Sequence, residues 1–321
     1  MTKSSVITKT RSKGFAKKKK TLLLLSMILP GTIWLILLRY LPMLGIVIAF
    51  QDFKIYSKAP SLLNNILHSK FVGFKNFKFL FATSDSWNMI RNTVGYNALW
   101  IVLTLVISVS FAIMLSILTN KLLAKTYQTI MFFPYFLSWV VASYFLMAFF
   151  DQTNGLVVHI QRALGVEVTS WYTDNRPWPA ILTVSNLWKN VGYSTVLYLA
   201  AIAGIDTSQY EAASIDGATK WQQVKYVTIP HIKPMMIILL IMNVGRIINS
   251  DFGLFYSVPQ NSGPLFPTTQ VLDTYVYRAF MATNKPEMST AASLLQNAVG
   301  FICVIAANTF VRKVDEDSSL F

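Results

Sequence analysis

The sequence contains few charged residues and a single cysteine. Only 13% of its residues are charged and 54% are hydrophobic, whereas a soluble globular domain carries about 25% charged residues. An ordinary soluble domain is therefore excluded. Cys303 lies alone in an apolar run and can form neither an internal disulfide nor a metal site by itself, so we predict a buried packing role. His159 and His231 have no metal-ligand neighbours in the sequence, and we predict no metal site.

Motifs for phosphate binding and catalysis are also missing. No G-x-x-x-x-G-K-[ST] sequence is present, so the chain cannot hold ATP phosphates in that way. No cluster of His, Asp and a nucleophile occurs at one depth, which argues against a membrane enzyme. Carboxylates are almost absent from the apolar runs, where Asp251 is the only candidate for the ion relay of a secondary transporter. We predict a non-catalytic chain without a cofactor.

Long apolar runs are abundant. Each exceeds or approaches the roughly 20 helical residues that cross a bilayer, and a β-barrel would instead show short alternating segments. The sequence predicts an all-α polytopic membrane protein with six transmembrane helices, at about residues 21–49, 92–118, 129–150, 178–202, 235–258 and 290–311. A short helix is expected at 271–281, and residues 71–81 mix Phe with Lys as an interfacial segment does.

The positive charge gathers in front of the first apolar run. Residues 1–20 contain eight Lys or Arg, which suits the cytoplasmic side of a membrane and anionic lipid. No set of aromatic side chains accompanies these lysines for base stacking, so the net charge of +14 does not indicate nucleic-acid binding. The apolar run is too long for a signal peptide and no cleavage site follows it. We predict a retained first span.

The distribution of basic residues also predicts the topology. With the N-terminus in the cytoplasm, the tails and the segments 119–128 and 205–234 hold 15 Lys or Arg, against 10 in the longer outer connections. Both termini are then cytoplasmic. We divide the chain into a basic tail (1–20), a first helix (21–50), an outer loop with the interfacial segment (51–91), a core (92–311) that includes the cytoplasmic loop 205–234, and a tail (312–321). No internal repeat is apparent.

The loop 205–234 is polar and charged between two apolar runs. Ser208 or Thr207 is expected to cap a helix that starts near Tyr210, and Gly217 to permit a turn. A second helix follows, with Trp221, Val224 and Val227 or Thr228 on one face, and Pro230 is expected to stop it before the next span. The loop is either a solvated connection or a docking element. In the second case, the acidic side chains of Glu211 and Asp216 would pair with basic residues of a partner.

The same loop resembles the EAA signature of ABC importer permeases, EAA-x3-G-x9-I-x-L-P. Glu211-Ala212-Ala213 is followed after three residues by Gly217 and, nine residues later, by Val-Thr-Ile-Pro at 227–230. Val227 and Ile229 replace the Ile and Leu that the family prefers. Residues 39–53, 71–77, 187–206 and 243–252 resemble the LplB-type branch of carbohydrate permeases, which is related to the maltose permeases. The resemblance covers nearly the whole chain after residue 20.

The resemblance implies a type I ABC importer permease fold in the bacterial cytoplasmic membrane. It implies a second, homologous permease subunit, two cytoplasmic ABC ATPase subunits, and an extracytoplasmic substrate-binding protein received by residues 51–90, 151–177 and 259–288. It also implies a saccharide substrate. The residues that would couple the chain to the ATPase are Glu211, Ala212, Ala213, Asp216, Gly217 and Pro230. The EAA-like loop indicates coupling to an ATPase but does not indicate which solute is transported. A permease for a peptide or another solute therefore remains an alternative, and an ion-coupled secondary transporter is a further one.

Polar residues within the spans predict a substrate pathway, because such residues usually face an interior or a water-filled cavity. Asn243, Arg246 and Asn249 or Ser250 are spaced for one helical face. The candidate pathway residues are Asn186, Trp188, Lys189, Asn190, Tyr193, Asn243, Arg246, Asn249, Ser250, Gln296 and Asn297. Amides can bind sugar hydroxyls, and aromatic rings can pack on sugar rings. The two cationic side chains, Lys189 and Arg246, would suit an acidic saccharide. Alternatively, these residues satisfy one another between packed helices.

Overall fold

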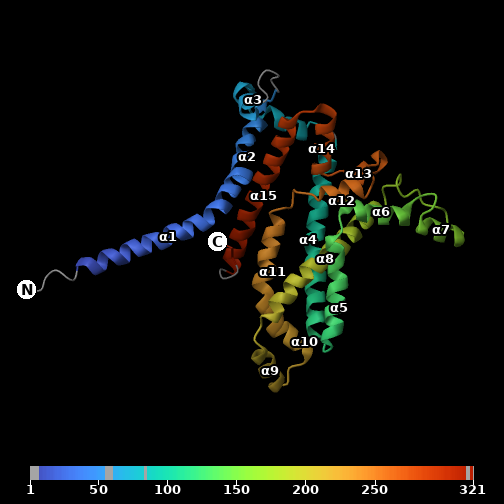
Figure 1. Cartoon of the computed structure of the whole chain (residues 1–321). Helices are drawn as coiled ribbons and strands as arrows, with labels where there is room; N and C mark the ends of the chain where they lie inside the picture. The colour runs from blue at the N-terminus through green and yellow to red at the C-terminus, as the bar shows by residue number, and fades with distance from the viewer. Residues whose placement is uncertain (1–6, 55–60, 83–84, 316–318, 321) are drawn as a thin grey trace, which may run out of the picture. The chain divides into compact units, whose positions relative to one another are not determined.

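The computed structural model describes residues 7–54, 61–82, 85–315 and 319–320 (Figure 1). The described chain is almost entirely helical, and its only strands form one two-stranded sheet. Two compact units divide at residue 76, the first being residues 1–76 and the second residues 77–321. The predicted all-α class is confirmed.

The first unit is a long helix followed by a small hairpin. Its elements are α1 (Ile7–Leu35), η1 (Ile36–Tyr40), α2 (Leu41–Met43), η2 (Leu44–Phe50), β1 (Gln51–Asp52), α3 (Leu62–His68) and β2 (Lys70–Phe71), with η3 (Gly73–Leu80) leading out. β1 pairs antiparallel with β2, with Gln51 opposite Phe71. The Asn76 amide of η3 donates to the backbone oxygens of Ala49 and Gln51 at 3.0 and 2.8 Å, which ties η3 to the junction of η2 and β1.

The second unit contains the remaining helices. They are α4 (Asp85–Ile117), α5 (Lys121–Phe132), η4 (Phe133–Phe136), α6 (Trp139–Phe150), α7 (Leu156–Ala163), α8 (Trp178–Ala203), α9 (Thr207–Ile215), α10 (Lys220–Gln223), η5 (Val224–Thr228), α11 (Ile229–Val244), α12 (Phe252–Ser257), η6 (Gly263–Leu265), α13 (Phe266–Thr269), α14 (Leu272–Thr283) and α15 (Pro286–Val314). α8 packs against α4, α5 and α11, and α15 packs against α11. In Figure 1, α9 and α10 lie at one end of these helices, and α12, α13 and α14 lie towards the other.

The buried apolar side chains of this unit form separate clusters along the helices. Near α12, Trp100 of α4 stacks on Phe255 with ring centroids 5.5 Å apart, and Trp139 and Trp178 join the same cluster. Towards α9, Tyr198 and Ile202 of α8 pack with Val109 of α4 and Ile232 of α11. Between these clusters, α4, α8 and α11 leave room for the cavity described below.

Length and hydropathy identify four described helices that could cross a membrane, namely Thr21–Phe50, Ser86–Ile117, Lys220–Val244 and Pro286–Lys313. A fifth span results if the bent pair Lys121–Phe136 and Trp139–Phe150 counts as one. α8 has 26 residues but is not among them, because polar residues such as Asn186, Lys189 and Asn190 lower its hydropathy. These helices agree with the predicted polytopic helical membrane protein, while six spans and cytoplasmic termini remain predictions.

The predicted span at 129–150 is not one straight helix. The helix axis turns by 101° between η4 and α6. Pro134 cannot donate a backbone hydrogen bond, and the Ser138 hydroxyl caps the new helix by accepting from the backbone N–H of Val141 at 3.2 Å. The carbonyls freed at the bend are bound from α8, since the Lys189 ammonium donates to Tyr135 O at 3.0 Å and also to Leu137 O.

The predicted span at 235–258 is not one continuous helix either. α11 ends at Val244, and residues 245–251 are not helical before α12 begins. Side chains from three other helices satisfy this backbone. The Asn97 amide donates to Ile247 O and Asn249 O at 2.8 and 3.0 Å. Gln296 donates to Ile248 O at 3.1 Å, and the Asp273 carboxylate accepts from Ser250 N at 2.7 Å. Irregular backbone at such depth is tolerated where protein or a cavity surrounds it.

Candidate functional site

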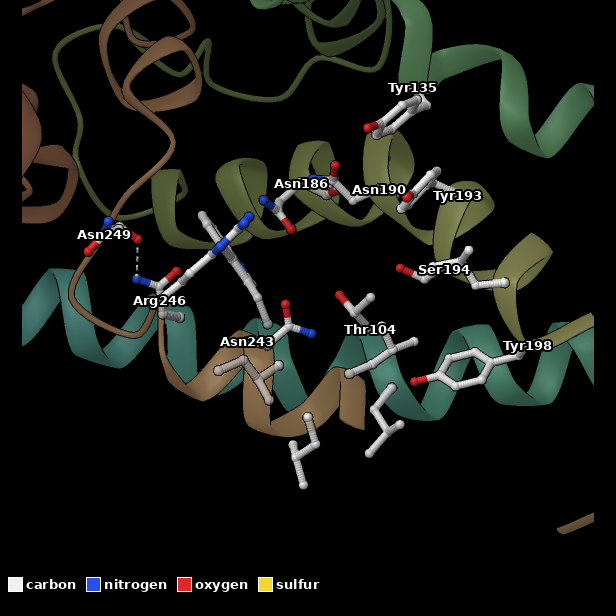
Figure 2. A pocket seen from close by; sticks show the side chains of 17 residues that line it. Thr104, Tyr135, Asn186, Asn190, Tyr193, Ser194, Tyr198, Asn243, Arg246 and Asn249 are labelled. Atoms are coloured by element: carbon white, nitrogen blue, oxygen red, sulfur yellow. Dashed lines mark hydrogen bonds between the residues drawn. The ribbon is translucent and has the colours of Figure 1, made fainter. Parts of the chain in front are cut away.

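A polar cavity of about 380 Å³ lies between α4, α8, α11 and the irregular backbone after α11 (Figure 2). α4 contributes the face on which Asn97, Trp100 and Thr104 lie three to four residues apart, so that one helical stripe faces the cavity. The lining consists of Asn97, Trp100, Ile101, Thr104, Leu105, Tyr135, Asn186, Asn190, Tyr193, Ser194, Leu197, Tyr198, Leu239, Leu240, Asn243, Arg246 and Asn249. A few polar groups placed among apolar walls are typical of small-molecule sites.

Arg246 is the only charged side chain in this lining, which contains no carboxylate. Its side chain is exposed, and no ion pair to its guanidinium occurs among the residues the structure describes. The break after α11 places Arg246 at one end of the cavity (Figure 2). A guanidinium without a partner in a largely neutral cavity favours an anionic group, because its planar fork matches a carboxylate.

Aromatic rings form the opposite end of the cavity. The rings of Tyr135 and Tyr193 are stacked with centroids 4.6 Å apart and planes 12° apart, and Figure 2 shows both away from Arg246. The amides of Asn186, Asn190 and Asn243 lie between the two ends. From one end to the other, the cavity thus offers a cation, hydrogen-bonding amides and a flat aromatic surface.

The cavity brings together six of the candidate pathway residues. These are Asn186, Asn190, Tyr193, Asn243, Arg246 and Asn249. Five others lie elsewhere. Lys189 binds the carbonyls at the bend before α6, and Trp188 lines a separate apolar hollow beside Phe133 and Phe149.

The remaining three candidates form hydrogen bonds within the protein. Gln296 is buried and binds Ile248 O and the Asp273 carboxylate, and Asn297 donates to Ser293 O at 2.8 Å within its own helix. Ser250 donates its backbone N–H to Asp273. For Gln296 and Asn297 the alternative, polar groups satisfied within the protein, describes the geometry.

Sequence reasoning missed several lining residues, namely Asn97, Trp100, Thr104, Tyr135, Ser194 and Tyr198. For α4 a signal was available, since Asn97 and Thr104 are polar and seven residues apart in an otherwise apolar run, a spacing that returns to the same helical face. Tyr135 carries no such signal, because its position depends on the bend between η4 and α6.

The loop 205–234 forms the short helix α9 and, after the turn, the start of a longer helix at α10, and the cap of α9 differs from the predicted one. Asp206, not Ser208 or Thr207, precedes α9, and its carboxylate accepts from the backbone N–H of Ser208 at 2.9 Å. That hydrogen bond holds the pKa of the Asp206 carboxyl below its usual range, so the cap stays charged. Gly217 has a φ of +78°, a left-handed conformation that glycine adopts without strain. The predicted glycine turn is confirmed.

Pro230 does not end the second helix. α10, the π-helical turn η5 and α11 continue into one another as the apolar helix Lys220–Val244. Proline clashes with the carbonyl one turn earlier in a regular α-helix, and the wider π-turn directly before Pro230 relieves that clash. The predicted shared face is wrong for Trp221. Trp221 is exposed, while Val224 and Thr228 are buried and the neighbouring Gln223 points inward to the Ser214 hydroxyl.

The turn around Gly217 presents both charge and apolar surface. Glu211, Ala212, Asp216, Gly217 and Pro230 are exposed, and Ala213 is half-buried. The apolar side chains of Ile215 and Trp221 are 86% and 71% exposed. Exposed apolar residues beside acidic ones suit contact with a protein partner.

These features define a class, namely a polytopic helical membrane protein of the transport type with a polar cavity between its helices. Among the described residues, no three His, Cys, Asp or Glu side chains gather as metal ligands would. Residues 105–314 match the family model described as "Binding-protein-dependent transport system inner membrane component". The chain belongs to this family. It is therefore a multi-pass inner-membrane permease component of an ABC transporter, a non-catalytic transport subunit.

Two relatives from Bacillus subtilis (strain 168) are similar along nearly their whole length. The polygalacturonan/rhamnogalacturonan transport system permease protein YteP is 32% identical, with 94% of each chain covered. Protein LplB is 30% identical over 94% of this chain and 91% of its own, which confirms the LplB-type resemblance. A crystal structure of a bacterial ABC transporter involved in the import of the acidic polysaccharide alginate contains a similar fold. Its TM-score is 0.81 at 28% identity, over 94% of this chain and 99% of that one.

Proposed function

We propose that this permease imports an oligo- or polysaccharide that carries carboxylate groups. The observation that carries the proposal is the cavity, in which one guanidinium without a carboxylate partner faces amides and stacked tyrosine rings. YteP is named for polygalacturonan and rhamnogalacturonan, and the similar solved transporter for the acidic polysaccharide alginate. An external binding protein would deliver the saccharide, and separate cytoplasmic ATPase subunits would supply the energy.

The chemistry of the cavity divides among three groups of residues. Arg246 would hold a sugar carboxylate through paired, charge-assisted hydrogen bonds. The Asn186, Asn190 and Asn243 amides would exchange hydrogen bonds with the hydroxyls, each amide having donors and an acceptor. Tyr193, stacked on Tyr135, would pack against the apolar face of a sugar ring. A cavity of about 380 Å³ lies within the range of small-molecule sites and would hold a few sugar units of a longer chain at a time.

The first prediction compares acidic and neutral saccharides in cells that contain the complete importer. Arg246→Gln should reduce ATP-dependent uptake of labelled oligogalacturonides about tenfold or more, since a charge-assisted pair contributes roughly 1.5–3 kcal/mol. Uptake of any neutral oligosaccharide that the importer accepts should change little. Arg246→Lys should give an intermediate loss, because an ammonium cannot bind a carboxylate in paired fashion.

Arg312→Gln is the matched control, because it removes the same charge from an exposed position in the last turn of α15. Immunoblots of isolated membranes show that each variant is inserted. Equal loss for acidic and neutral substrates in Arg246→Gln would mean that Arg246 supports the fold. Uptake of no saccharide, or uptake that follows an ion gradient and not ATP, would overturn the proposed function.

We further propose that the turn around Gly217 is where the chain couples to its ATPase. The support is the exposed surface of Glu211, Asp216, Ile215 and Trp221 at the tip of two capped helices, together with the EAA-like spacing. A second, homologous permease subunit would complete the pathway, and the outer segments 51–90, 151–177 and 259–288 would receive the binding protein.

The second prediction tests this coupling surface. Combining Glu211→Ala with Gly217→Pro should abolish uptake, because a proline cannot adopt a φ of +78° and a carboxylate is lost from the surface. Co-purification of the ATPase with the tagged permease should fall in parallel. Gly73→Ala is the control for ATPase co-purification, since Gly73 also has a positive φ, +61°, but lies in the outer segment 51–90, which no cytoplasmic subunit would contact. Persistent uptake and ATPase binding in the double variant would contradict the assignment.

A further inference from the structure

A second cavity of about 640 Å³ lies at the end of the helices where α9 and α10 are found. Its walls come from the last turn of α4, the first turns of α5, the end of α8, and α9, α10 and η5. Its lining shares no residue with that of the first cavity, although α4 and α8 contribute to both.

The charge of this cavity is entirely positive. Lys121, Lys125 and Lys220 line it, and no Asp or Glu does. Lys121 and Lys125 are four residues apart on α5 and therefore share a face, while Lys220 opens α10 on the other side. None of the three forms an ion pair among the described residues. Lys220 has a weak neutral contact instead, to the Gln223 side-chain oxygen at 3.3 Å.

The cavity also lies where lipid headgroups would be. One candidate span, Ser86–Ile117, ends at Ile117, and another, Lys220–Val244, begins at Lys220. Both of these residues line the cavity. Half of the wall is apolar, including Leu118, Ile202 and Ala203, so lysines and hydrocarbon surface meet at one depth. Basic pockets between helices at the membrane surface suit phosphate-bearing lipid headgroups.

We propose that this cavity binds the phosphate group of an anionic membrane phospholipid, with the start of an acyl chain against the apolar wall. The phosphate would lie between Lys121 and Lys125 on α5 and Lys220 on α10. It would thereby join α5 to the start of the helix Lys220–Val244. A lipid rather than a soluble phosphate compound is favoured by the apolar half of the wall and by the two span ends that meet there.

The test measures lipid binding to the full-length chain purified in detergent, by titration calorimetry. Short-chain phosphatidylglycerol, short-chain phosphatidylcholine and glycerol 3-phosphate serve as probes. Phosphatidylglycerol should bind one site at least tenfold more tightly than either of the others. The triple variant Lys121→Gln, Lys125→Gln, Lys220→Gln should lose this preference about tenfold or more, as each lysine near a membrane surface adds attraction to anionic lipid. Replacing the same three lysines with arginine should retain it.

Lys17→Gln, Lys18→Gln, Lys19→Gln is the matched control, because it removes the same charge from the basic N-terminal segment and should leave the single-site preference intact. Ala203→Trp places a large side chain on the apolar wall at an exposed position. It should weaken the binding of phosphatidylglycerol and leave the binding of glycerol 3-phosphate unchanged.

Three outcomes would overturn the proposal. Equal binding of glycerol 3-phosphate and phosphatidylglycerol would assign the cavity to a soluble phosphate compound. An equal loss of the preference for phosphatidylglycerol in both triple glutamine variants would show a general effect of net charge. Phosphatidylglycerol binding that survives the substitution of all three lining lysines would place the lipid elsewhere. None of these measurements depends on which solute the permease transports.

Discussion

At the scale of single residues, Gly192 determines how closely α8 approaches α5. A Cβ atom built on Gly192 would overlap the backbone carbonyl of Met131 in α5. Gly192→Ala should therefore destabilise the chain by about 1–3 kcal/mol, as overpacking does, and lower the melting temperature in detergent. Gly95→Ala is the control on the neighbouring helix α4, because a Cβ there meets nothing within 4 Å and alanine favours helix.

If the two alanine variants melted at the same temperature, the α5–α8 contact would not be as close as the structure has it. The comparison is sharp because both glycines are helical and both substitutions are identical. Only the surroundings of the added methyl group differ between the two positions.

The residues of the cavity show how far sequence reasoning reaches at this scale. Asn186, Asn190 and Asn243 are recognisable because an amide inside an apolar run needs a polar surrounding. The same rule also selected Lys189 and Gln296, whose polar atoms bind backbone carbonyls instead. The rule shows that each of these side chains needs a hydrogen-bond partner. It does not show whether that partner is a substrate or another part of the chain. That choice depends on where neighbouring helices break, which no local pattern reveals.

At the scale of elements, Lys189 connects the bend between η4 and α6 to the cavity. Its ammonium binds Tyr135 O and Leu137 O, and the Tyr135 ring lines the cavity. Lys189→Met should remove the ammonium donor from both carbonyls, of which the Leu137 carbonyl is part-buried and loses the more by it. The ring of Tyr135 would then lose its fixed place beside Tyr193.

The expected result of Lys189→Met is a higher KM for acidic and neutral saccharides alike in cellular uptake assays, in contrast to the selective loss expected for Arg246→Gln. Lys189→Arg, which keeps donors within reach, should restore much of the uptake. A loss confined to acidic saccharides would instead show that the Lys189 charge contacts the substrate directly.

The elements also show why some predicted spans form one uninterrupted helix and others do not. α4 and α15 contain the predicted runs 92–118 and 290–311 almost entirely, because hydropathy alone determines a helix that is uninterrupted. The runs 129–150 and 235–258 break because distant side chains, among them Lys189, Asn97 and Gln296, satisfy the freed backbone groups. The reverse occurs at Pro230, where a π-turn preserves a helix that proline was expected to end.

At the scale of the whole molecule, the number of spans and the side of each loop remain predictions. Hydropathy and length support four membrane-spanning helices, or five if the bent pair counts as one span. α8 can be the sixth span only if its polar face lines the cavity and does not face lipid. The cavity supplies that condition, since Asn186, Asn190, Tyr193 and Ser194 of α8 line it. A span rich in amides is then compatible with a membrane.

The last prediction tests this topology through the single cysteine of the chain. In a Cys303→Ser background, each of Ser12→Cys, Ser214→Cys, Ser170→Cys and Thr283→Cys introduces one thiol at a chosen loop or tail. With six spans and cytoplasmic termini, a membrane-impermeant maleimide added to intact cells should label the variants at 170 and 283, and label those at 12 and 214 only after the membrane is opened. Labelling of position 214 in intact cells would place the loop 205–234 outside, where no cytoplasmic ATPase could reach it, and would overturn both the topology and the coupling surface. Labelling of position 12 in intact cells, with position 214 still protected, would instead imply that one span before α9 is miscounted, either α8 or the bent pair.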